Sequence, residues 1–359
     1  MQAAILKAFG TPLEIGTMPD PELRPGDVVV DVVAAGVLAY TAEVLSGARN
    51  YVMPLPIVPG PGSIGRVRAV GADATRLEPG DWVFCDPTVR SRDDALAPDI
   101  MLQGWSARGE GGQKLQLHWR HGGFAEQMRV PTENAIRIGA IEPEHAGRWC
   151  ALTKLLVPYG GLLAAGLQAG ETLLVNGATG AFGCAGVAVA LAMGAGTVLA
   201  TGRNGAALAE LERRFGRRVR TVQMQGDEEA DRARILAAAP GPIDCVLDLL
   251  PPMASAAQVR TGILAVRPYG RIVLMGGVGM LGGAALELPY PWLMRNCITL
   301  RGQWMCPPEA VTGMVALIRA GLIDLSLWEV AEFGLDAANE AVAHAADKAG
   351  PFNMTVLRP

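Results

Sequence analysis

The stretch VNGATGAFGCAGVAVALAMGAGTVLATGRN, residues 175–204, decides the fold of this chain. The apolar segment TLLVN at 172–176 leads directly into three glycines in a G-x-x-G-x-x-G spacing, and an apolar helical segment follows them. A second apolar run, TVLAT at 197–201, comes next. A strand, a glycine turn, a helix and another strand in this order predict one βαβ unit of a parallel sheet.

The three glycines predict a binding site for a dinucleotide. The first, Gly177, allows the tight turn after the strand, and Gly180 lets the backbone approach a pyrophosphate. The third, Gly183, lets the helix pack closely on the sheet. The helix N-terminus then offers free N–H groups and a positive dipole to the anion. The predicted cofactor contacts in this loop are Gly177, Ala178, Thr179, Gly180, Ala181, Phe182 and Gly183.

The end of the second strand indicates whether the bound ribose carries a 2′-hydroxyl or a 2′-phosphate. NAD-binding versions of this motif place a carboxylate about 20 residues on, against the ribose 2′-hydroxyl. This chain has Gly202, Arg203 and Asn204 there, and an arginine offers a planar donor fork to a 2′-phosphate. We therefore expect NADP(H), with an arginine that stacks on adenine or points to solvent as the alternative. Two further glycines in a later strand-end segment, Gly276 and Gly277, complete the predicted cofactor contacts.

Length and composition point to a two-domain enzyme. A chain of 359 residues exceeds one ordinary core, and 50% hydrophobic with 18% charged residues fits a well-packed globular protein. The net charge of −4 argues against a nucleic-acid partner. The basic segment LERRFGRRVR at 211–220 is interpreted as a solvated helix end.

The compartment is predicted from the cysteines and the apolar runs. Six scattered cysteines without a C-x-x-C pair are typical of reduced thiols in a cytoplasmic protein. We expect no signal peptide at the N-terminus. The longest apolar run, around 184–200, is broken by glycines, so it predicts a buried helix and strand and no membrane span.

Two patterns divide the chain. Residues 1–150 carry valine-rich strands broken by Pro and Gly, which predict an irregular, mostly antiparallel β domain. Residues 88–122 interrupt this pattern and are either a functional loop or a surface excursion. From about 170, helical segments alternate with strands and predict a doubly wound parallel sheet. The expected strands are 172–176, 197–201, 219–224, 244–250, 271–276 and 298–305, with helices at 206–215 and 228–239 among those between them, and a tail of two helices and a strand.

With these residues in view, the chain resembles the medium-chain dehydrogenase/reductase superfamily, which includes zinc alcohol dehydrogenases and quinone oxidoreductases. The resemblance covers nearly the whole length. It rests on GDVVVDVVAAGV, LPIVPGPGSIGRV, LEPGDWVF, GGFAEQMRVP, YGRIVLMGG and the glycine loop. It implies an α/β chain in which a mostly β, GroES-like catalytic domain (1–157 and 301–359) surrounds a Rossmann NADP-binding domain (158–300).

The zinc ligands of these relatives have no counterpart here. Leu38 and Pro61-Gly62 stand where zinc alcohol dehydrogenases carry cysteine and His-Glu, and Thr153 stands near the remaining cysteine. None of these side chains suits zinc. The structural-zinc lobe of four cysteines is absent, and no thiol or carboxylate cluster accompanies His118 and His121. We therefore predict no metal.

Without zinc, hydride transfer is easier to an acceptor that delocalises charge, such as a quinone or an α,β-unsaturated carbonyl. Two tyrosines could donate the proton or hydrogen bond. Tyr40 falls where the zinc enzymes carry a relay hydroxyl, and Tyr51 near the tyrosine acid of mitochondrial-type enoyl reductases. Amphipathic packing is the alternative for each, and Thr41 is a weaker candidate. The candidate pocket residues, each of which could instead belong to a core or an interface, are Trp105, Trp119, Thr153, Met280 and Trp304.

The sequence thus predicts a zinc-independent, NADP(H)-dependent oxidoreductase acting on a small, conjugated, hydrophobic carbonyl compound. The resemblance also implies a homodimer joined through the sheet edge at ITLRGQWM, residues 298–305. Two other interpretations stay open. One is a zinc-free alcohol dehydrogenase or ketone reductase, and the other is a catalytically idle dinucleotide-binding protein.

Overall fold

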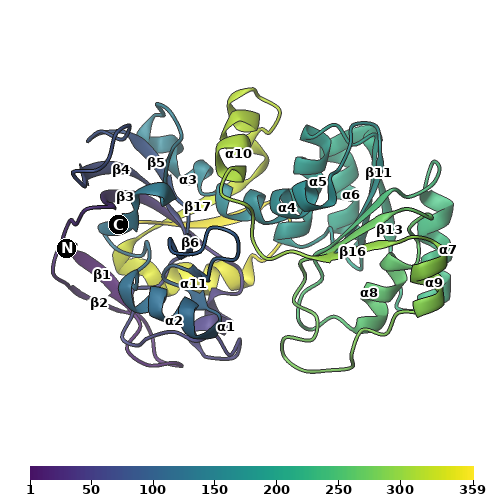
Figure 1. Cartoon of the computed structure of the whole chain (residues 1–359), viewed down its shortest axis with the longest axis horizontal. Helices are drawn as coiled ribbons and strands as arrows, with labels where there is room; N and C mark the ends of the chain where they lie inside the picture. Colours follow the sequence, from purple (N-terminus) through teal and green to yellow (C-terminus); the bar gives the residue numbers. More distant parts are fainter. The chain divides into compact units, whose positions relative to one another are not determined.

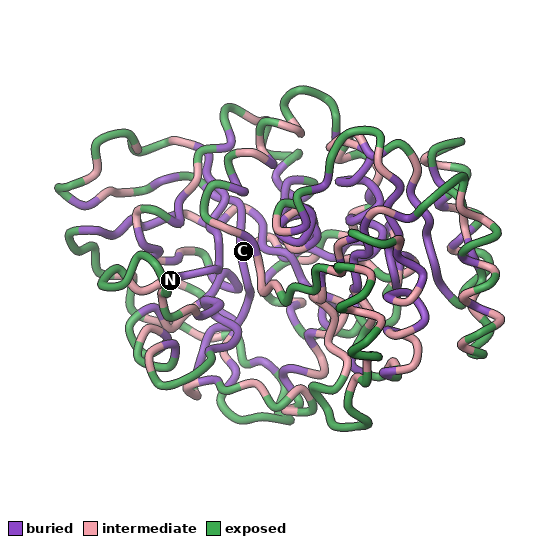
Figure 2. Tube along the Cα trace, turned by 45° about the vertical axis from the view of Figure 1, so that its right-hand side comes forward, coloured by how far each residue is buried: buried purple, intermediate pink, exposed green.

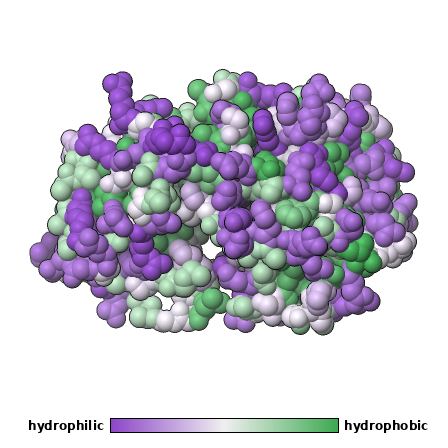
Figure 3. Space-filling view, turned by 180° about the vertical axis from the view of Figure 1, so that it is seen from behind, coloured by the Kyte–Doolittle hydropathy of each residue, from purple (hydrophilic) through white to green (hydrophobic).

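The computed structural model describes all residues, 1–359, and divides them into two compact units (Figure 1). Unit 1 comprises residues 1–153, 325–349 and 353–359, and unit 2 comprises residues 154–324 and 350–352. In Figure 2 the buried residues follow the strands of the units, and the exposed residues follow mainly the connecting loops. Hydrophilic side chains dominate the face shown in Figure 3, with hydrophobic ones in smaller groups among them.

Unit 1 is built on a mostly antiparallel sheet in the order β10-β5-β4-β3-β18-β17, with β9 also pairing to β3. The long central strand β3 carries the valine-rich segment, and most of its residues are buried because both neighbours and the core cover it. The sheet strands are β3 (Asp27–Val37), β4 (Ser63–Val70), β5 (Trp82–Cys85), β9 (Gln127–Pro131), β10 (Ala135–Arg137), β17 (Glu329–Gly334) and β18 (Asn353–Arg358). A separate hairpin pairs β1 (Gln2–Ile5) with β2 (Glu14–Thr17). The helices of the unit are α1 (Thr41–Leu45), α2 (Gly109–His118), α3 (Ala146–Trp149) and α11 (Ala338–Asp347).

The segment at 88–122 folds into a small lobe with its own core. Three short strands, β6 (Thr88–Arg90), β7 (Ile100–Leu102) and β8 (Ser106–Ala107), form an antiparallel sheet beside α2. Its buried cluster consists of Val89, Met101, Ala107 and Trp119, with Leu115 packed against it. The side chain of Gln103 ties the lobe down by donating to the carbonyls of His121 and Arg129. The lobe is thus an ordered part of unit 1.

Unit 2 contains a six-stranded, all-parallel sheet in the order β13-β12-β11-β14-β15-β16, which confirms the predicted doubly wound sheet. Every strand falls on a predicted segment. The strands are β11 (Thr172–Asn176), β12 (Thr197–Gly202), β13 (Val219–Gln223), β14 (Cys245–Asp248), β15 (Arg271–Leu274) and β16 (Thr299–Gly302). The helices are α4 (Leu152–Ala165), which begins at the boundary with unit 1, α5 (Ala181–Ala192), α6 (Gly205–Phe215), α7 (Glu228–Ala238), α8 (Ala256–Ile263), α9 (Tyr290–Arg295) and α10 (Ala310–Arg319).

Side-chain caps explain where three of these helices begin. Asn204 caps α6 and Asp227 caps α7, each accepting a backbone N–H with its side-chain oxygen. Ser255 and Gln258 form a capping box at α8. In contrast, α5 starts at the N-cap Gly180 with no side-chain cap, which leaves its N-terminus open to a ligand.

Helices cover both faces of the parallel sheet (Figure 1). On one face α4 and α5 pack closely, because a Cβ at Gly186 of α5 would lie 3.3 Å from Pro158 of α4 and 3.4 Å from Leu247 of β14. On the other face α7 and α8 bury Ile235 and Val259 against the strands. Burial on both faces is the reason that β11, β12 and β14 consist of continuous apolar runs.

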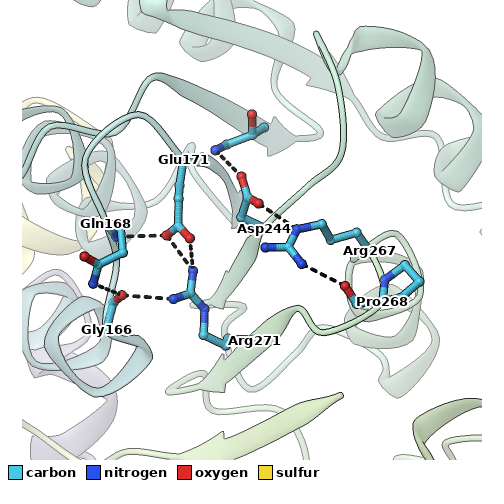
Figure 4. A network of polar contacts seen from close by, with 8 residues as sticks. Gly166, Gln168, Glu171, Asp244, Arg267, Pro268 and Arg271 are labelled. Carbon is cyan, nitrogen blue, oxygen red and sulfur yellow. Dashed lines mark hydrogen bonds and ion pairs between the residues drawn. The ribbon is translucent and has the colours of Figure 1, made fainter. Parts of the chain in front are cut away.

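Ion pairs join the amino ends of the parallel strands (Figure 4). Arg271, at the start of β15, pairs with Glu171 before β11 and donates to the carbonyl of Gly166 at 3.0 Å. Asp244, before β14, accepts from Arg267 at 2.7 Å and from the backbone N–H of Thr172 at 2.8 Å. The charges at this end are therefore paired with one another, and the opposite, carboxyl end is where an open α/β sheet binds ligands.

The two compact units do not follow the predicted domain boundaries throughout. Residues 154–157, 301–324 and 350–352 lie in unit 2, although the resemblance assigns them to the catalytic domain. The physical reason is that β16 completes the parallel sheet and α10 follows directly from it. No helix is both long and apolar enough to cross a bilayer, and all six cysteines are free.

Candidate functional site: a glycine loop, a buried polar network and a tyrosine pair

The glycine loop lies at the point where the strand order of the sheet reverses, between β11 and its two neighbours β12 and β14. Gly177 follows β11 with φ of +85°, a conformation that favours glycine. A Cβ at Gly183 would lie 2.1 Å from the carbonyl oxygen of Gly177, so only glycine lets α5 start this close to the turn. The loop is therefore shaped by backbone contacts at both of these glycines.

The ends of β11 and β12 are in direct contact. A Cβ at Gly202 would lie 2.3 Å from the Cγ2 of Thr179, and the N–H of Ala178 donates to the carbonyl of Thr201 at 2.8 Å. The loop and the end of β12 thus form one surface. Beside them lies the uncapped N-terminus of α5, which is suited to an anion because its first N–H groups lack intrahelical acceptors.

Arg203 is exposed at the end of β12, and its guanidinium makes no hydrogen bond or ion pair within the chain. Its carbonyl accepts from Gln223 of the adjacent strand at 3.1 Å, which fixes the backbone. Asn204 instead uses its Oδ1 to cap α6, accepting from Ala207 at 3.1 Å. Of the two residues, Arg203 alone keeps its whole polar group available to a ligand.

A buried polar network beneath the loop was not predicted. The Oγ1 of Thr201 donates to the Oδ1 of Asn176 at 3.0 Å, and the Nδ2 of Asn176 donates to the Oδ1 of Asp248 at 2.9 Å. The three residues end β12, β11 and β14, and all are at most 2% exposed. The one sequence feature that could have predicted this network is a polar residue at the end of an apolar strand, as in TLLVN and CVLD. The network holds the three strand ends in fixed register below the glycine loop.

Burial raises the pKa of the Asp248 carboxyl from 3.8 to about 7, opposed by the hydrogen bonds from Asn176 and the Leu250 backbone. Gly276 lies against this group, and its neighbour Gly277 lies against Pro252. A Cβ at Gly276 would be 2.6 Å from the Oδ2 of Asp248, and one at Gly277 would be 2.7 Å from the Cγ of Pro252. Close packing therefore explains both glycines, and whether they also contact a cofactor stays a prediction.

In unit 1 the two candidate acids lie together. The rings of Tyr40 and Tyr51 both meet Trp105 edge-on, with centroids 5.9 Å and 6.4 Å from its ring. Burial raises the pKa of both hydroxyls. Thr41 begins α1 beside them, fully buried, and its Oγ1 has no hydrogen-bond partner. The structure thus assembles a half-buried pair of protonated phenols.

The positions equivalent to zinc ligands also lie in unit 1. Leu38 is buried and apolar, and Gly62 has φ of +83°. A Cβ at Gly62 would lie 3.3 Å from the Oγ1 of Thr153, a buried hydroxyl without a hydrogen-bond partner. No group of three or more His, Cys, Asp or Glu side chains in the chain is arranged to hold a metal ion.

The two histidines considered for a metal have structural contacts instead. The Nδ1 of His121 accepts from the backbone N–H of Val58 at 3.1 Å, and burial lowers the pKa of His121 to about 4. His118 packs edge-on against Trp119, with ring centroids 4.9 Å apart. Neither ring lies in a ligand cluster.

The five candidate pocket residues are not gathered in one place by either unit. Trp105 joins the tyrosine pair, whereas Trp119 is buried in the core of the small lobe. Thr153 lies against Gly62. Met280 is 58% exposed in unit 2, and Trp304 is half-buried just after β16. A pocket formed by these side chains stays a prediction.

Comparison with known proteins agrees with this architecture. Residues 24–140 match the family model described as the alcohol dehydrogenase GroES-like domain, and residues 181–320 match the model described as zinc-binding dehydrogenase. The chain belongs to the medium-chain dehydrogenase/reductase superfamily. It is an oxidoreductase of this superfamily.

Individual members of the superfamily are only distantly similar. Sorbitol dehydrogenase of Bacillus subtilis is 22% identical over 93% of this chain and 90% of its own length. Acryloyl-coenzyme A reductase of Metallosphaera sedula is 28% identical over 55% of this chain and 58% of its own length. A Sinorhizobium meliloti protein solved with bound NADP shares the fold with a TM-score of 0.79 and 20% identity, covering 100% of this chain and 99% of that one.

Zinc, which the description of the second family model implies, does not fit the residues of this chain. Leucine, proline and glycine offer no donor at three of the equivalent positions, and the fourth supplies the neutral hydroxyl of Thr153. Zinc sites in proteins need thiolate, imidazole or carboxylate ligands. We therefore derive no step through a metal.

The buried carboxyl of Asp248 generates a prediction about stability. Its pKa is about 7 in the folded chain, against 3.8 when unfolded, so the folded state binds the extra proton between these values. Stability supplied by this group is therefore complete below pH 4 and is lost as the pH rises towards 7. The free energy of unfolding of wild type, relative to Asp248→Asn, should fall across this window.

Urea unfolding followed by circular dichroism at several pH values measures this difference. The matched control is Asp347→Asn, an exposed aspartate whose replacement should leave the pH dependence unchanged. Parallel pH profiles for wild type and Asp248→Asn would contradict the assignment of a neutral buried carboxyl.

Proposed function

We propose that this chain is a zinc-independent, NADP(H)-dependent oxidoreductase that reduces a conjugated, hydrophobic carbonyl compound such as an enone, an enoyl thioester or a quinone. The observation that carries the proposal is the combination of donor-free side chains at three zinc-ligand positions with two phenols that pack on the same tryptophan, Trp105, in the same unit. Unit 2 would bind the nucleotide and unit 1 would supply the acid.

The glycine loop and the N-terminus of α5 would hold the pyrophosphate, and Arg203 would bind the 2′-phosphate. Support comes from the exposed and unpaired guanidinium of Arg203 and from the structural neighbour solved with NADP. When bound, the nicotinamide supplies the hydride. The residues of the chain are left with binding, orientation and the proton.

The substrate class follows from the acid. A zinc ion polarises an ordinary carbonyl and stabilises a developing alkoxide, and a neutral phenol is a much weaker electrophile. An acceptor that spreads the incoming charge over a conjugated system needs less help, so a hydrogen bond from Tyr40 or Tyr51 suffices for its enolate-like oxygen. The similarity to acryloyl-coenzyme A reductase supports a conjugated acceptor.

Reduction of a simple ketone is the second candidate. The observation in its favour is that similar proteins include sorbitol dehydrogenase and several alcohol dehydrogenases. In that case the same phenols would protonate an alkoxide.

We also propose that the chain forms a homodimer through β16. This strand ends the parallel sheet, and all four of its residues are exposed. Large apolar side chains are exposed on β16 and on the nearby segment of sequence that leads to it, among them Leu300, Met294 and Tyr290. An unpaired edge with this composition favours pairing with a second copy.

The cofactor proposal predicts the effect of Arg203→Met. We expect the KM for NADPH to rise by about tenfold or more, because one charged hydrogen-bonding partner of a phosphate is lost, while the KM for NADH changes little. Initial rates with both nucleotides measure the two constants. Arg217→Met removes an exposed arginine from the nearby basic segment and serves as the control. Equal losses with NADPH and NADH would show that Arg203 does not bind the 2′-phosphate.

The reaction proposal predicts the order of acceptors. Oxidation of NADPH should be fastest with an enone or quinone and slow with an unconjugated ketone, and Tyr51→Phe should lower kcat by about a hundredfold through loss of the acid. Tyr269→Phe, at an exposed tyrosine, is the control. Faster turnover of the ketone would favour the second candidate, and no turnover of any acceptor would refute both. Zinc bound stoichiometrically by the active enzyme would refute the metal-free mechanism.

The homodimer predicts a light-scattering mass twice that of the chain. Leu300→Arg should shift the protein towards the monomer, because it places a charge in the proposed strand pairing. Leu96→Arg, at a 98% exposed leucine of unit 1, should leave the dimer intact. A wild-type protein of monomer mass at micromolar concentration would rule the dimer out.

A further inference from the structure

Arg49 lies over one of the two candidate acids, and neither the comparisons nor the sequence motifs assign it a role. Its guanidinium carbon is 4.6 Å from the ring centroid of Tyr40. Its Nε donates to the Oε2 of Glu43 at 2.7 Å, and its backbone N–H donates to the Glu43 carbonyl at 3.2 Å. The side chain of Arg49 is 10% exposed. The guanidinium is thus held by one hydrogen bond to Glu43 beside the Tyr40 ring, the backbone of Arg49 is held by a second, and the side chain is largely withdrawn from water.

The local backbone explains how Arg49 reaches this position. The short helix α1 ends at Leu45, and the chain turns back through Gly47, with φ of +85°, and Asn50, with φ of +54°. This turn returns Arg49 to Glu43 of the same helix. Glycine and asparagine are the residues that adopt such backbone most readily. The segment 40–51 therefore forms one compact turn that starts and ends with a tyrosine.

We propose that Arg49, anchored by Glu43, is a positioning residue that makes Tyr40 and Tyr51 work as one proton-donating unit. The inference rests on the proposed function, because it assigns a role towards the acid of that reaction. When a phenol protonates the reduced acceptor, its O–H bond breaks, and an electron pair of the acceptor forms the new bond to hydrogen, at the α-carbon of an enolate or at the anionic oxygen of a reduced quinone. A tyrosinate remains until water returns the proton.

The electrostatics of the turn favour that tyrosinate. Burial raises the pKa of both phenols, and the positive charge of Arg49 lowers the pKa of each. The charge of an ionised Tyr51 raises the pKa of Tyr40 further. Tyr51 is therefore the phenol that ionises more readily, and Tyr40, under the guanidinium, supports the charge that forms.

The charged groups acting on the pair belong to the turn itself. They are Arg49, which favours ionisation, and Glu43, which raises the pKa of Tyr51. The helix α11 also packs on α1, and its buried residues, Ala338, Ala341, Val342 and Ala345, are apolar, while its His344 is hydrogen-bonded to Thr355. From α2, the neutral side chain of Gln116 reaches the Val52 carbonyl at 3.1 Å. The Trp105 ring contacts both tyrosines and carries no charge.

The test is a spectroscopic titration that needs no substrate. Tyrosinate absorbance is followed after rapid pH jumps, and the contribution of the pair is obtained by subtracting the matched Tyr40→Phe/Tyr51→Phe variant. In Arg49→Met the midpoint of the pair should move up by about one pH unit, because a nearby positive charge is lost. Arg49→Lys keeps the positive charge but loses the planar group over the Tyr40 ring. Its titration midpoint should therefore lie between those of Arg49→Met and the wild type.

Arg68→Met is the control, since Arg68 forms an exposed pair with Asp31 elsewhere in unit 1 and should titrate like wild type. Wild-type midpoints in both Arg49 variants would overturn the inference. If circular dichroism shows that Arg49→Met does not fold, the test rests on Arg49→Lys. A titration midpoint of Arg49→Lys equal to that of the wild type would then refute a role for the stacked guanidinium.

Kinetics separate this inference from the proposed function. If the wild-type protein reduces conjugated acceptors, Arg49→Met should lower kcat by about tenfold with little change in KM, and Arg49→Lys should restore part of the rate. Should the wild-type protein reduce no acceptor, the proposed function fails, while the titration still decides whether Arg49 acts on the tyrosine pair.

Discussion

The close approach of Gly183 to the carbonyl of Gly177 is the constraint on which unit 2 depends. With 2.1 Å between a Cβ at 183 and that oxygen, any side chain would push the start of α5 away from the turn after β11. The turn is therefore short, and α5 is drawn against β11 and the helix α4 beside it. The same shortness leaves the helix N-terminus open above the sheet. Packing and anion binding thus share one cause.

Much of the fold of unit 2 could be predicted because its local signals agree. The central parallel strands are apolar runs buried on both faces, and a segment with helical periodicity follows each of them. The local sequence and the tertiary structure therefore favour the same elements. The strand β17 is not predicted because its residues are exposed or half-buried, without the apolar run that marks the strands of unit 2. The sequence does not decide between a functional loop and a surface excursion at 88–122, because the core of this segment depends on the contact of Trp119 with Val89 and Met101.

The site was predictable in part for a similar reason. Glycines show their backbone role in the sequence, so the loop and the exposed Arg203 could be named in advance. The network of Thr201, Asn176 and Asp248 could not, since its members end three strands that only the sheet order brings together. Tyr40 and Tyr51 were named separately, and the turn that joins them through Arg49 and Glu43 became visible only in three dimensions.

The contact between Gly202 and Thr179 has a consequence for changing the cofactor preference of this chain by design. NAD-binding versions of the motif carry an acidic residue near the end of the second strand, where it holds an unphosphorylated ribose. Here even a methyl group at 202 would overlap the threonine, at 2.3 Å from its Cγ2, so a carboxylate introduced there would displace the loop that it was meant to assist. The exposed neighbour at 203 is the position that can accept the new charge without moving the backbone.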